Sequence, residues 1–266
     1  MHGNGLARLM EAWHKEHNGQ WDSPAWKAFL EDFEGLIAFK RDELLEEHSN
    51  NGKFGMSKAG GCSRASALKL LGYKGEPFTG STRVTFFLGH IVECLAIATL
   101  RAIGYNIEGT QEPVAIKGIM HSASDGIIKG DIPSMPSLFG GEAVLSVKSA
   151  GYKKSGKERR GSKFIFVRRG FPELPFEGVR RAQPGHWAQM QAEMHGYNLA
   201  GRRVNKSLYL VCSKDIIKAM EEDEYLGEAG NGSLTFYTET VEYNPDWCKN
   251  TLVPLWERQW MATQTG

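Results

Sequence analysis

Two carboxylates and a lysine stand in the chain at positions where they could do chemistry together. Glu93 interrupts an apolar segment of helical periodicity, and Asp125 precedes a glycine at the start of a strand-like segment. Ser146 and Lys148 share one face of an apolar strand, because side chains alternate along a strand with a period of two. Carboxylates bind hard cations such as Mg²⁺ or Mn²⁺, and a lysine can position an attacking water and offset phosphate charge. These residues therefore predict metal-dependent phosphodiester chemistry.

A later helical segment adds Gln189, Gln191 and Glu193. A carboxylate within an apolar helix is costly to bury unless a partner or a metal compensates it, which applies to Glu93 and Glu193 alike. We expect Glu193 to join Glu93 and Asp125 in holding the cation. The two glutamines are expected to orient water, the lysine or the substrate backbone.

These residues lie in elements that the apolar periodicity predicts. Helices are expected at residues 6–17, 24–48, 63–71, 85–103, 184–199, 216–226 and 245–261, with Ser23 capping the second. Strands are expected at residues 112–117, 126–129, 143–147, 207–212 and 234–243. This order indicates an α/β fold whose mixed central sheet is flanked by helices. We expect an acidic N-terminal helical arm (1–50), with ten acidic and five basic residues in its first 48, before a domain spanning 51–266.

In these stretches the chain resembles the PD-(D/E)XK nuclease superfamily, in its phage (lambda-type) exonuclease and RecB-like branches. Residues 89–93 match a helix of form G-x-x-x-E, and residues 125–126 match a D-G at a strand. The run S-V-K-S at 146–149 matches (D/E)-x-K-S in part, and residues 188–194 match A-Q-x-Q-x-x-M. The resemblance covers about residues 56–245 and is specific in the order of the motifs.

The resemblance implies a restriction-endonuclease-like core and a Mg²⁺- or Mn²⁺-dependent deoxyribonuclease. It favours an exonuclease acting at linear or single-stranded DNA ends over a sequence-specific endonuclease. The role it implies is in recombination, replication or repair, in a phage or bacterial setting, with a recombination or replication protein as a possible partner.

The chain departs from the superfamily at Ser146, which takes the place of the acidic residue two before the lysine. Serine is a poorer ligand for a divalent cation than a carboxylate. The acid could be supplied from elsewhere, by Glu193 or by Glu142 on the same strand face. Alternatively, the chain is an engineered inactive variant, or a natural nuclease fold that binds DNA or recruits a partner protein without cutting DNA.

Residues 149–181 form a strongly basic segment, with ten Lys or Arg against three Glu. Aromatic residues are interleaved with the charges, a pattern on which single-stranded nucleic acid can stack, although a solvated loop would have the same composition. The residues expected to bind DNA are Arg64, Lys153, Lys154, Lys157, Arg159, Arg160, Lys163, Arg168 and Arg169.

Composition excludes several other classes of protein. The four cysteines are too few for a disulfide scaffold and include no C-x-x-C pair, so a reducing cytoplasm is the expected compartment. The iron–sulfur members of the RecB-like branch need three clustered cysteines near the C-terminus, and here only Cys212 and Cys248 follow the core, so no iron–sulfur cluster is expected. The charged first twenty residues do not resemble a secretory signal. We find no uninterrupted apolar run of 18 residues and therefore expect no membrane span.

Overall fold

The computed structural model describes residues 4–45, 54–59, 62–73, 79–110, 112–129, 141–150, 152–160, 163–170, 174–213 and 236–264. Its centre is a five-stranded sheet in the order β10-β9-β6-β5-β2. The strands are β2 (Asn106–Glu108), β5 (Gly126–Lys129), β6 (Glu142–Ala150), β9 (Lys206–Ser213) and β10 (Phe236–Glu242). β6 and β9 are parallel and the other neighbours are antiparallel. The predicted mixed sheet is confirmed.

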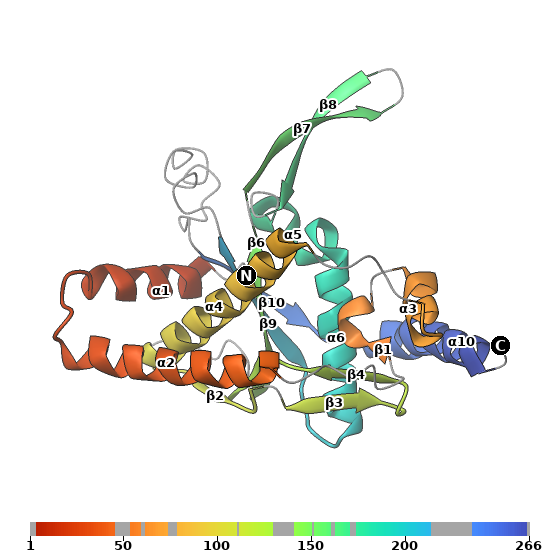
Figure 1. The fold of residues 1–266 in the computed structure, drawn as a ribbon, viewed down its shortest axis with the longest axis horizontal. Coiled ribbons are helices and arrows are strands. Elements are labelled where there is room, and N and C mark those ends of the chain that lie inside the picture. The colour runs from red at the N-terminus through yellow and green to blue at the C-terminus, as the bar shows by residue number, and fades with distance from the viewer. Residues whose placement is uncertain are drawn as a thin grey trace.

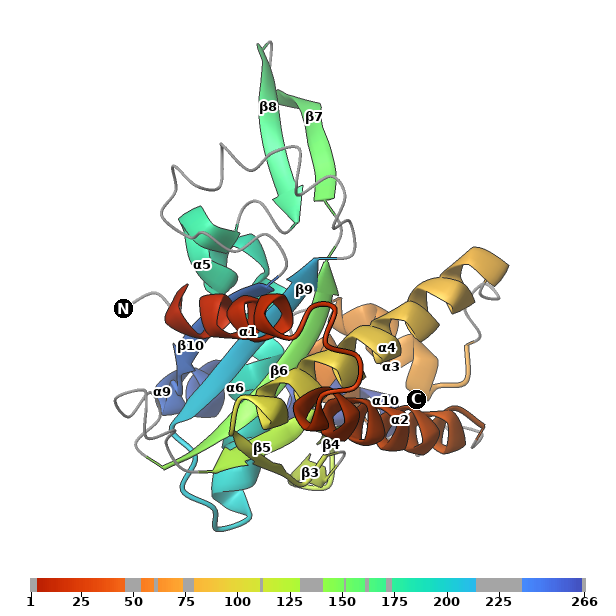
Figure 2. The ribbon, with the colours of Figure 1, turned by 90° about the vertical axis from the view of Figure 1, so that its left-hand side faces the viewer.

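Helices cover both faces of this sheet because the side chains of β6 and β9 alternate between two apolar clusters. Val144 and Tyr209 face α6 (Pro184–Leu199), whose buried residues belong to the same cluster. Leu145 and Leu208 face α4 (Gly80–Ala102) on the opposite side. In Figure 2, α1 and α4 cross in front of the sheet and α6 lies behind it. A two-sided core of this kind is what holds an α/β sheet together.

The N-terminal helices α1 (Asn4–Glu16) and α2 (Pro24–Leu45) pack onto the α4 side of the sheet. Ser23 caps α2 as expected, since its Oγ accepts a hydrogen bond from the backbone N–H of Trp26 at 3.2 Å. Apolar residues of both helices, Met10 and Phe29 among them, are buried in the cluster that contains α4. The domain boundary expected at residue 50 lies outside the described residues.

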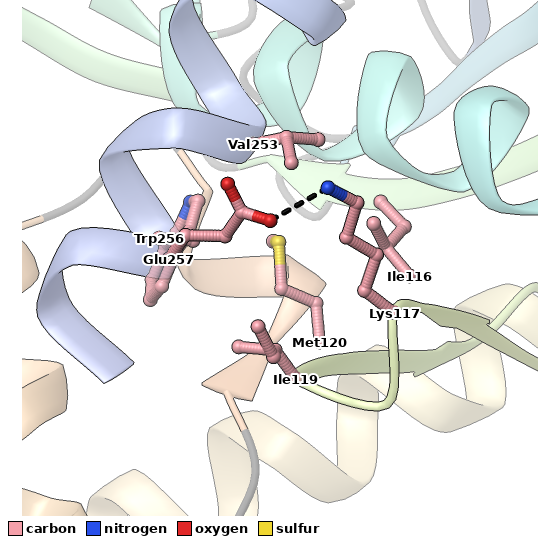
Figure 3. Close-up of a pocket in the computed structure, with 7 residues that line it drawn as sticks. All are labelled: Ile116, Lys117, Ile119, Met120, Val253, Trp256 and Glu257. Carbon is pink, nitrogen blue, oxygen red and sulfur yellow. Dashed lines mark hydrogen bonds and ion pairs between the residues drawn. The ribbon is translucent and has the colours of Figure 1, made fainter. Parts of the chain in front are cut away.

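A second, smaller sheet in the order β1-β4-β3 supports the C-terminal helix. It consists of β1 (Phe54–Gly55), β3 (Pro113–Ile116) and β4 (Met120–Ala123), with the short η1 (Met56–Lys58) after β1. Trp256 of α10 (Val253–Gln264) is almost fully buried, with its ring centroid 4.5 Å from that of Phe54. Beside it, Lys117 pairs with Glu257 at 2.6 Å over a cavity of about 10 Å³, room for one water (Figure 3).

The remaining elements connect these layers. α3 (Ser63–Leu70) packs against α10, and α5 (Leu174–Ala182) precedes α6. α9 (Pro245–Trp247) and the π-helix η3 (Cys248–Leu252) lead into α10, so the helix expected over 245–261 is present as three consecutive helical pieces. The helix expected at 216–226 lies outside the described residues.

The basic segment contains a β-hairpin. β7 (Tyr152–Arg160) follows almost directly on β6 and pairs in antiparallel fashion with β8 (Lys163–Gly170). The hairpin projects away from the rest of the protein in both views (Figures 1 and 2). It therefore continues the line of the strand that carries Ser146 and Lys148.

The helix α4 requires a correction to the expectation about membranes. Its segment Val84–Ala102 is long and apolar enough to cross a membrane by length and composition, with a mean hydropathy of 1.5. The sequence criterion missed it because charged residues interrupt the run. In the structure the second half of this segment, including Ile97 and Leu100, is buried in the core. The first half leaves Phe86 and Phe87 about half exposed.

Candidate active site

Asp125 and Lys148 meet where β5 and β6 lie side by side. Lys148 Nζ lies 3.9 Å from Asp125 Oδ2, and that oxygen accepts a hydrogen bond from the backbone N–H of Val147 at 2.6 Å. Gly126 makes this placement possible, since a Cβ there would lie 2.7 Å from the Ile107 side chain of β2. The close pairing of β5 with β2 on one side and β6 on the other thus holds the carboxylate against the strand that carries the lysine.

Glu193 reaches the same group from α6. Its side chain is almost completely buried, and Oε1 accepts hydrogen bonds from Ser122 Oγ at 2.9 Å and Gln189 Nε2 at 2.8 Å. Gln189 and Glu193 are four residues apart and so share one face of the helix. Gln189 therefore acts here by fixing the carboxylate of Glu193.

Burial and mutual repulsion make these carboxylates hard to ionise. Burial, joined by the charges of Glu93 and Glu193, raises the pKa of Asp125 to about 7, although Lys148 and the hydrogen bond from the N–H of Val147 act to lower it. Burial also raises the pKa of Glu193, although Lys148 and the hydrogen bonds from Gln189 and Ser122 act to lower it. Added positive charge would therefore be favourable at this position.

The raised pKa predicts a specific dependence of stability on pH. The folded protein holds a proton on Asp125 that the unfolded chain releases near pH 4, so in EDTA stability is expected to fall as pH rises from about 4 to about 7. Between pH 5 and 8 this loss amounts to about 2–3 kcal/mol at about 1.4 kcal/mol per pKa unit. The measurement is urea unfolding of the unsubstituted chain and of Asp125→Asn, each at pH 5 and at pH 8. The difference between the two proteins in their loss of stability is the contribution of Asp125. Equal pH dependence in the two proteins would contradict the prediction.

Ser146 lies beside this group on β6, next to Leu145, which pairs with Gly126 at the start of β5. It is 1% exposed, and its Oγ has no hydrogen-bond partner among the residues that the structure describes. A buried hydroxyl without a partner is costly, and an added ligand or water that it can bind recovers that cost.

Glu93 stands at the site but is already paired. Lys40 of α2 contacts its Oε1 at 2.9 Å, and His90 Nδ1 lies 3.7 Å from its Oε2. Burial acts to raise the pKa of Glu93, but His90 and Lys40 together hold it below its ordinary value. Glu93 is therefore a stable carboxylate, with the ammonium of Lys40 and the imidazole of His90 beside it.

Gln191 was expected at the site, but in the structure its side chain lies away from the carboxylates. Its side-chain amide donates to the carbonyl of Glu242 at 2.8 Å and accepts from the N–H of Asn244 at 2.7 Å. It is fully buried and ties the end of β10 to α6. Two residues apart on a helix, Gln189 and Gln191 point in different directions, so only the first reaches the carboxylates.

Glu142, the other proposed source of the missing acid, is engaged at the start of β6. It lies 3.8 Å from Lys129 and 3.7 Å from Arg202, both on its own end of the sheet. Ser146 is four residues further along the strand. Of the two candidates, the structure thus brings Glu193 to the Asp125 group and leaves Glu142 with other partners.

The proposed DNA-binding residues fall into two places. Arg64 is exposed on α3. The others are residues of the hairpin strands: Lys153, Lys154, Lys157, Arg159 and Arg160 in β7, and Lys163, Arg168 and Arg169 in β8.

His186 is a neighbour of the site that was not expected there from the sequence. Its Nδ1 lies 2.7 Å from the hydroxyl of Tyr209, which stands opposite Ser146 in the parallel pairing of β6 and β9. Burial, and after it the charge of Lys148, lower the pKa of His186 to about 4. The imidazole is therefore neutral near pH 7, and only the fold brings it close to the lysine.

The donor chemistry of the site fits one hard cation. No three His, Cys, Asp or Glu side chains converge on a metal position within the described ranges. Mg²⁺ commonly takes only one or two carboxylates and completes its shell with water and substrate phosphate. Asp125 and Glu193, with their raised pKa values, and the unpartnered hydroxyl of Ser146 suit such a cation.

Comparison with known proteins gives similarity at the level of structure. No protein-family model matches the chain, and no curated protein is significantly similar to it. A crystal structure of LHK-Exo in complex with dAMP aligns with 80% of this chain and 87% of its own, at 14% identity and a TM-score of 0.42. A crystal structure of SSO0001 aligns with 86% of this chain and 85% of its own, at 14% identity and a TM-score of 0.43.

Proposed function

We propose that this chain is a metal-dependent deoxyribonuclease, an exonuclease that hydrolyses phosphodiester bonds from DNA ends. The observation that carries the proposal is the contact of Lys148 with Asp125 beside the buried carboxylate of Glu193. Paired carboxylates and a lysine are the side chains that metal-assisted phosphodiester hydrolysis uses. The motif order that resembles PD-(D/E)XK nucleases supports the same reaction class.

In this proposal Asp125 and Glu193 hold one Mg²⁺ or Mn²⁺, with the hydroxyl of Ser146 beside it. Such a cation, when bound, polarises a phosphoryl oxygen and makes water a better nucleophile near neutral pH. Lys148 orients the attacking water and offsets the charge that develops on the phosphate. Gln189 holds Glu193 in position through its 2.8 Å hydrogen bond.

The hairpin β7–β8 is the proposed grip on the DNA strand, since it carries eight of the nine predicted DNA-binding residues and follows directly on β6. Phosphate contacts by lysine and arginine bind DNA without regard to sequence, as an enzyme that digests from ends requires. We propose a cytoplasmic role in recombination, replication or repair, in a phage or bacterial cell.

The second candidate is a DNA-binding module of the same fold without catalysis. Ser146 favours it, because a neutral hydroxyl stands where the superfamily pattern has an acid. The two candidates differ in their dependence on metal. A nuclease loses all cleavage in chelator, whereas a binding module holds DNA with or without metal and releases it steeply as salt rises.

The deciding experiment uses end-labelled linear DNA and closed circular DNA, with Mg²⁺, Mn²⁺ or EDTA. We expect loss of label from linear DNA with either cation, intact circles, and no product in EDTA. Cleavage of circles at the same rate would replace the exonuclease by an endonuclease. Activity found only in Ser146→Glu would identify the unsubstituted chain as a disabled nuclease. DNA binding without cleavage in both proteins would favour the binding module.

A further inference from the structure

Lys40 is a buried lysine of α2 that lies beside the candidate site. It is 6% exposed although it lies near the end of α2, and its ammonium is 2.9 Å from Glu93 Oε1. Lysine is almost never buried to this extent unless it is paired. Its position is thus set by Glu93, one of the carboxylates whose charge Asp125 senses.

A second ion pair fixes the same two helices further from the site. Arg101 of α4 donates to Asp32 of α2 at 2.6 Å, and both side chains are about a third exposed. The two pairs are eight residues apart on each helix, as antiparallel neighbours require. The interface therefore offers one ion pair at the candidate site and a matched one away from it.

We propose that Lys40 occupies the cation position at Glu93, so that the site takes a single divalent cation, held by Asp125 and Glu193. This rests on the proposed function. A lysine ammonium within contact distance of a buried carboxylate supplies the positive charge that a second metal ion would otherwise bring. The α2 helix is then part of the site, and its lysine decides how many cations the carboxylates bind.

Binding of Mn²⁺ to the full-length chain, followed by the electron paramagnetic resonance of free Mn²⁺ and by calorimetry, tests the proposal. Lys40→Met removes the ammonium that contacts Oε1 of Glu93, so that a cation can take its place at that oxygen. We expect Mn²⁺ to bind at least about tenfold more tightly, or in a second equivalent, because a like charge close to the cation is lost. Lys40→Gln provides the same test should the methionine variant fold poorly.

Three controls make the result specific. Lys40→Arg keeps the charge and should bind Mn²⁺ as the natural chain does. Arg101→Met breaks the remote ion pair between the same helices and should also leave Mn²⁺ binding unchanged. Adding Glu93→Gln to Lys40→Met removes the freed carboxylate and should return Mn²⁺ binding to the natural level.

The outcomes separate this inference from the proposed function. Equal Mn²⁺ affinity and stoichiometry in the natural chain and both neutral Lys40 variants would overturn the inference, whether or not DNA is cut. A gain in both Lys40→Met and Arg101→Met would also overturn it, because loosened helix packing would then be the cause. A gain confined to the neutral Lys40 variants supports it, and does so even if the natural chain fails to cleave DNA.

Discussion

Lys148→Ala is expected to lower the kcat/KM for DNA cleavage by about a hundred- to a thousandfold, the effect of removing one preorganised charge-stabilising donor. The ammonium lies 3.9 Å from Asp125, and its positive charge also lowers the pKa of Glu193 and of His186. It is therefore a positive charge that acts on all three groups. Single-turnover cleavage of end-labelled linear DNA with Mg²⁺ measures the effect. DNA affinity, measured in EDTA at fixed salt, should change little because the proposed grip is the hairpin.

Lys129→Ala is the matched control for this prediction. Lys129 belongs to the adjacent strand β5 and pairs with Glu108 at 2.6 Å and Glu142 at 3.8 Å, toward the other end of the sheet. Cleavage should survive this substitution. Equal losses of cleavage in the two variants would mean that Lys148 acts only through the overall positive charge of the protein. Unaltered cleavage in Lys148→Ala would show that the lysine has no part in the reaction.

Glu193→Gln is expected to reduce cleavage by about a hundredfold or more, since the site would lose one of two proposed carboxylate ligands. The amide oxygen can still accept the hydrogen bonds from Ser122 and Gln189, so the local structure should persist. Because burial raises the pKa of Glu193, replacing the carboxylate with a neutral amide should not destabilise the fold. Cleavage rates measure the loss of activity, and thermal unfolding measures whether the stability is unchanged.

Glu142→Gln decides between the two possible sources of the missing acid. Its carboxylate already lies near Lys129 and Arg202, and the loss of these partly exposed ion pairs should cost little stability. Cleavage should be retained. A loss of cleavage in Glu142→Gln with full activity in Glu193→Gln would reverse the assignment.

Local sequence signals were sufficient for the long elements. The helix expected at 184–199 is α6 within the same bounds, because a proline at the first turn and apolar spacing act within a few residues. Helix α4 was expected from residue 85 and begins at Gly80, because residues 80–83 (G-S-T-R) contain no apolar side chain and so add nothing to the apolar pattern. Three-residue β2 and the hairpin β7–β8 escaped prediction, because strands are stabilised by partners that a local window does not contain.

The residues of the site divide in the same way. Period-two alternation puts Ser146 and Lys148 on one face of a strand, and helical spacing puts Gln189 and Glu193 on one face of α6. These are local relations, and the sequence by itself determined them. The contact between Lys148 and Asp125 was expected only from the motif order.

Tertiary structure alone decided the electrostatic state of the site. The pairing of Lys40 with Glu93 joins residues 53 positions apart in helices that the chain order does not oblige to touch. Gln191 hydrogen-bonds the backbone of residues 242 and 244 because packing places these groups beside it. The raised pKa of Asp125 likewise results from its burial in the folded core. Burial and charge–charge distance are properties of the folded core, and no local pattern contains them.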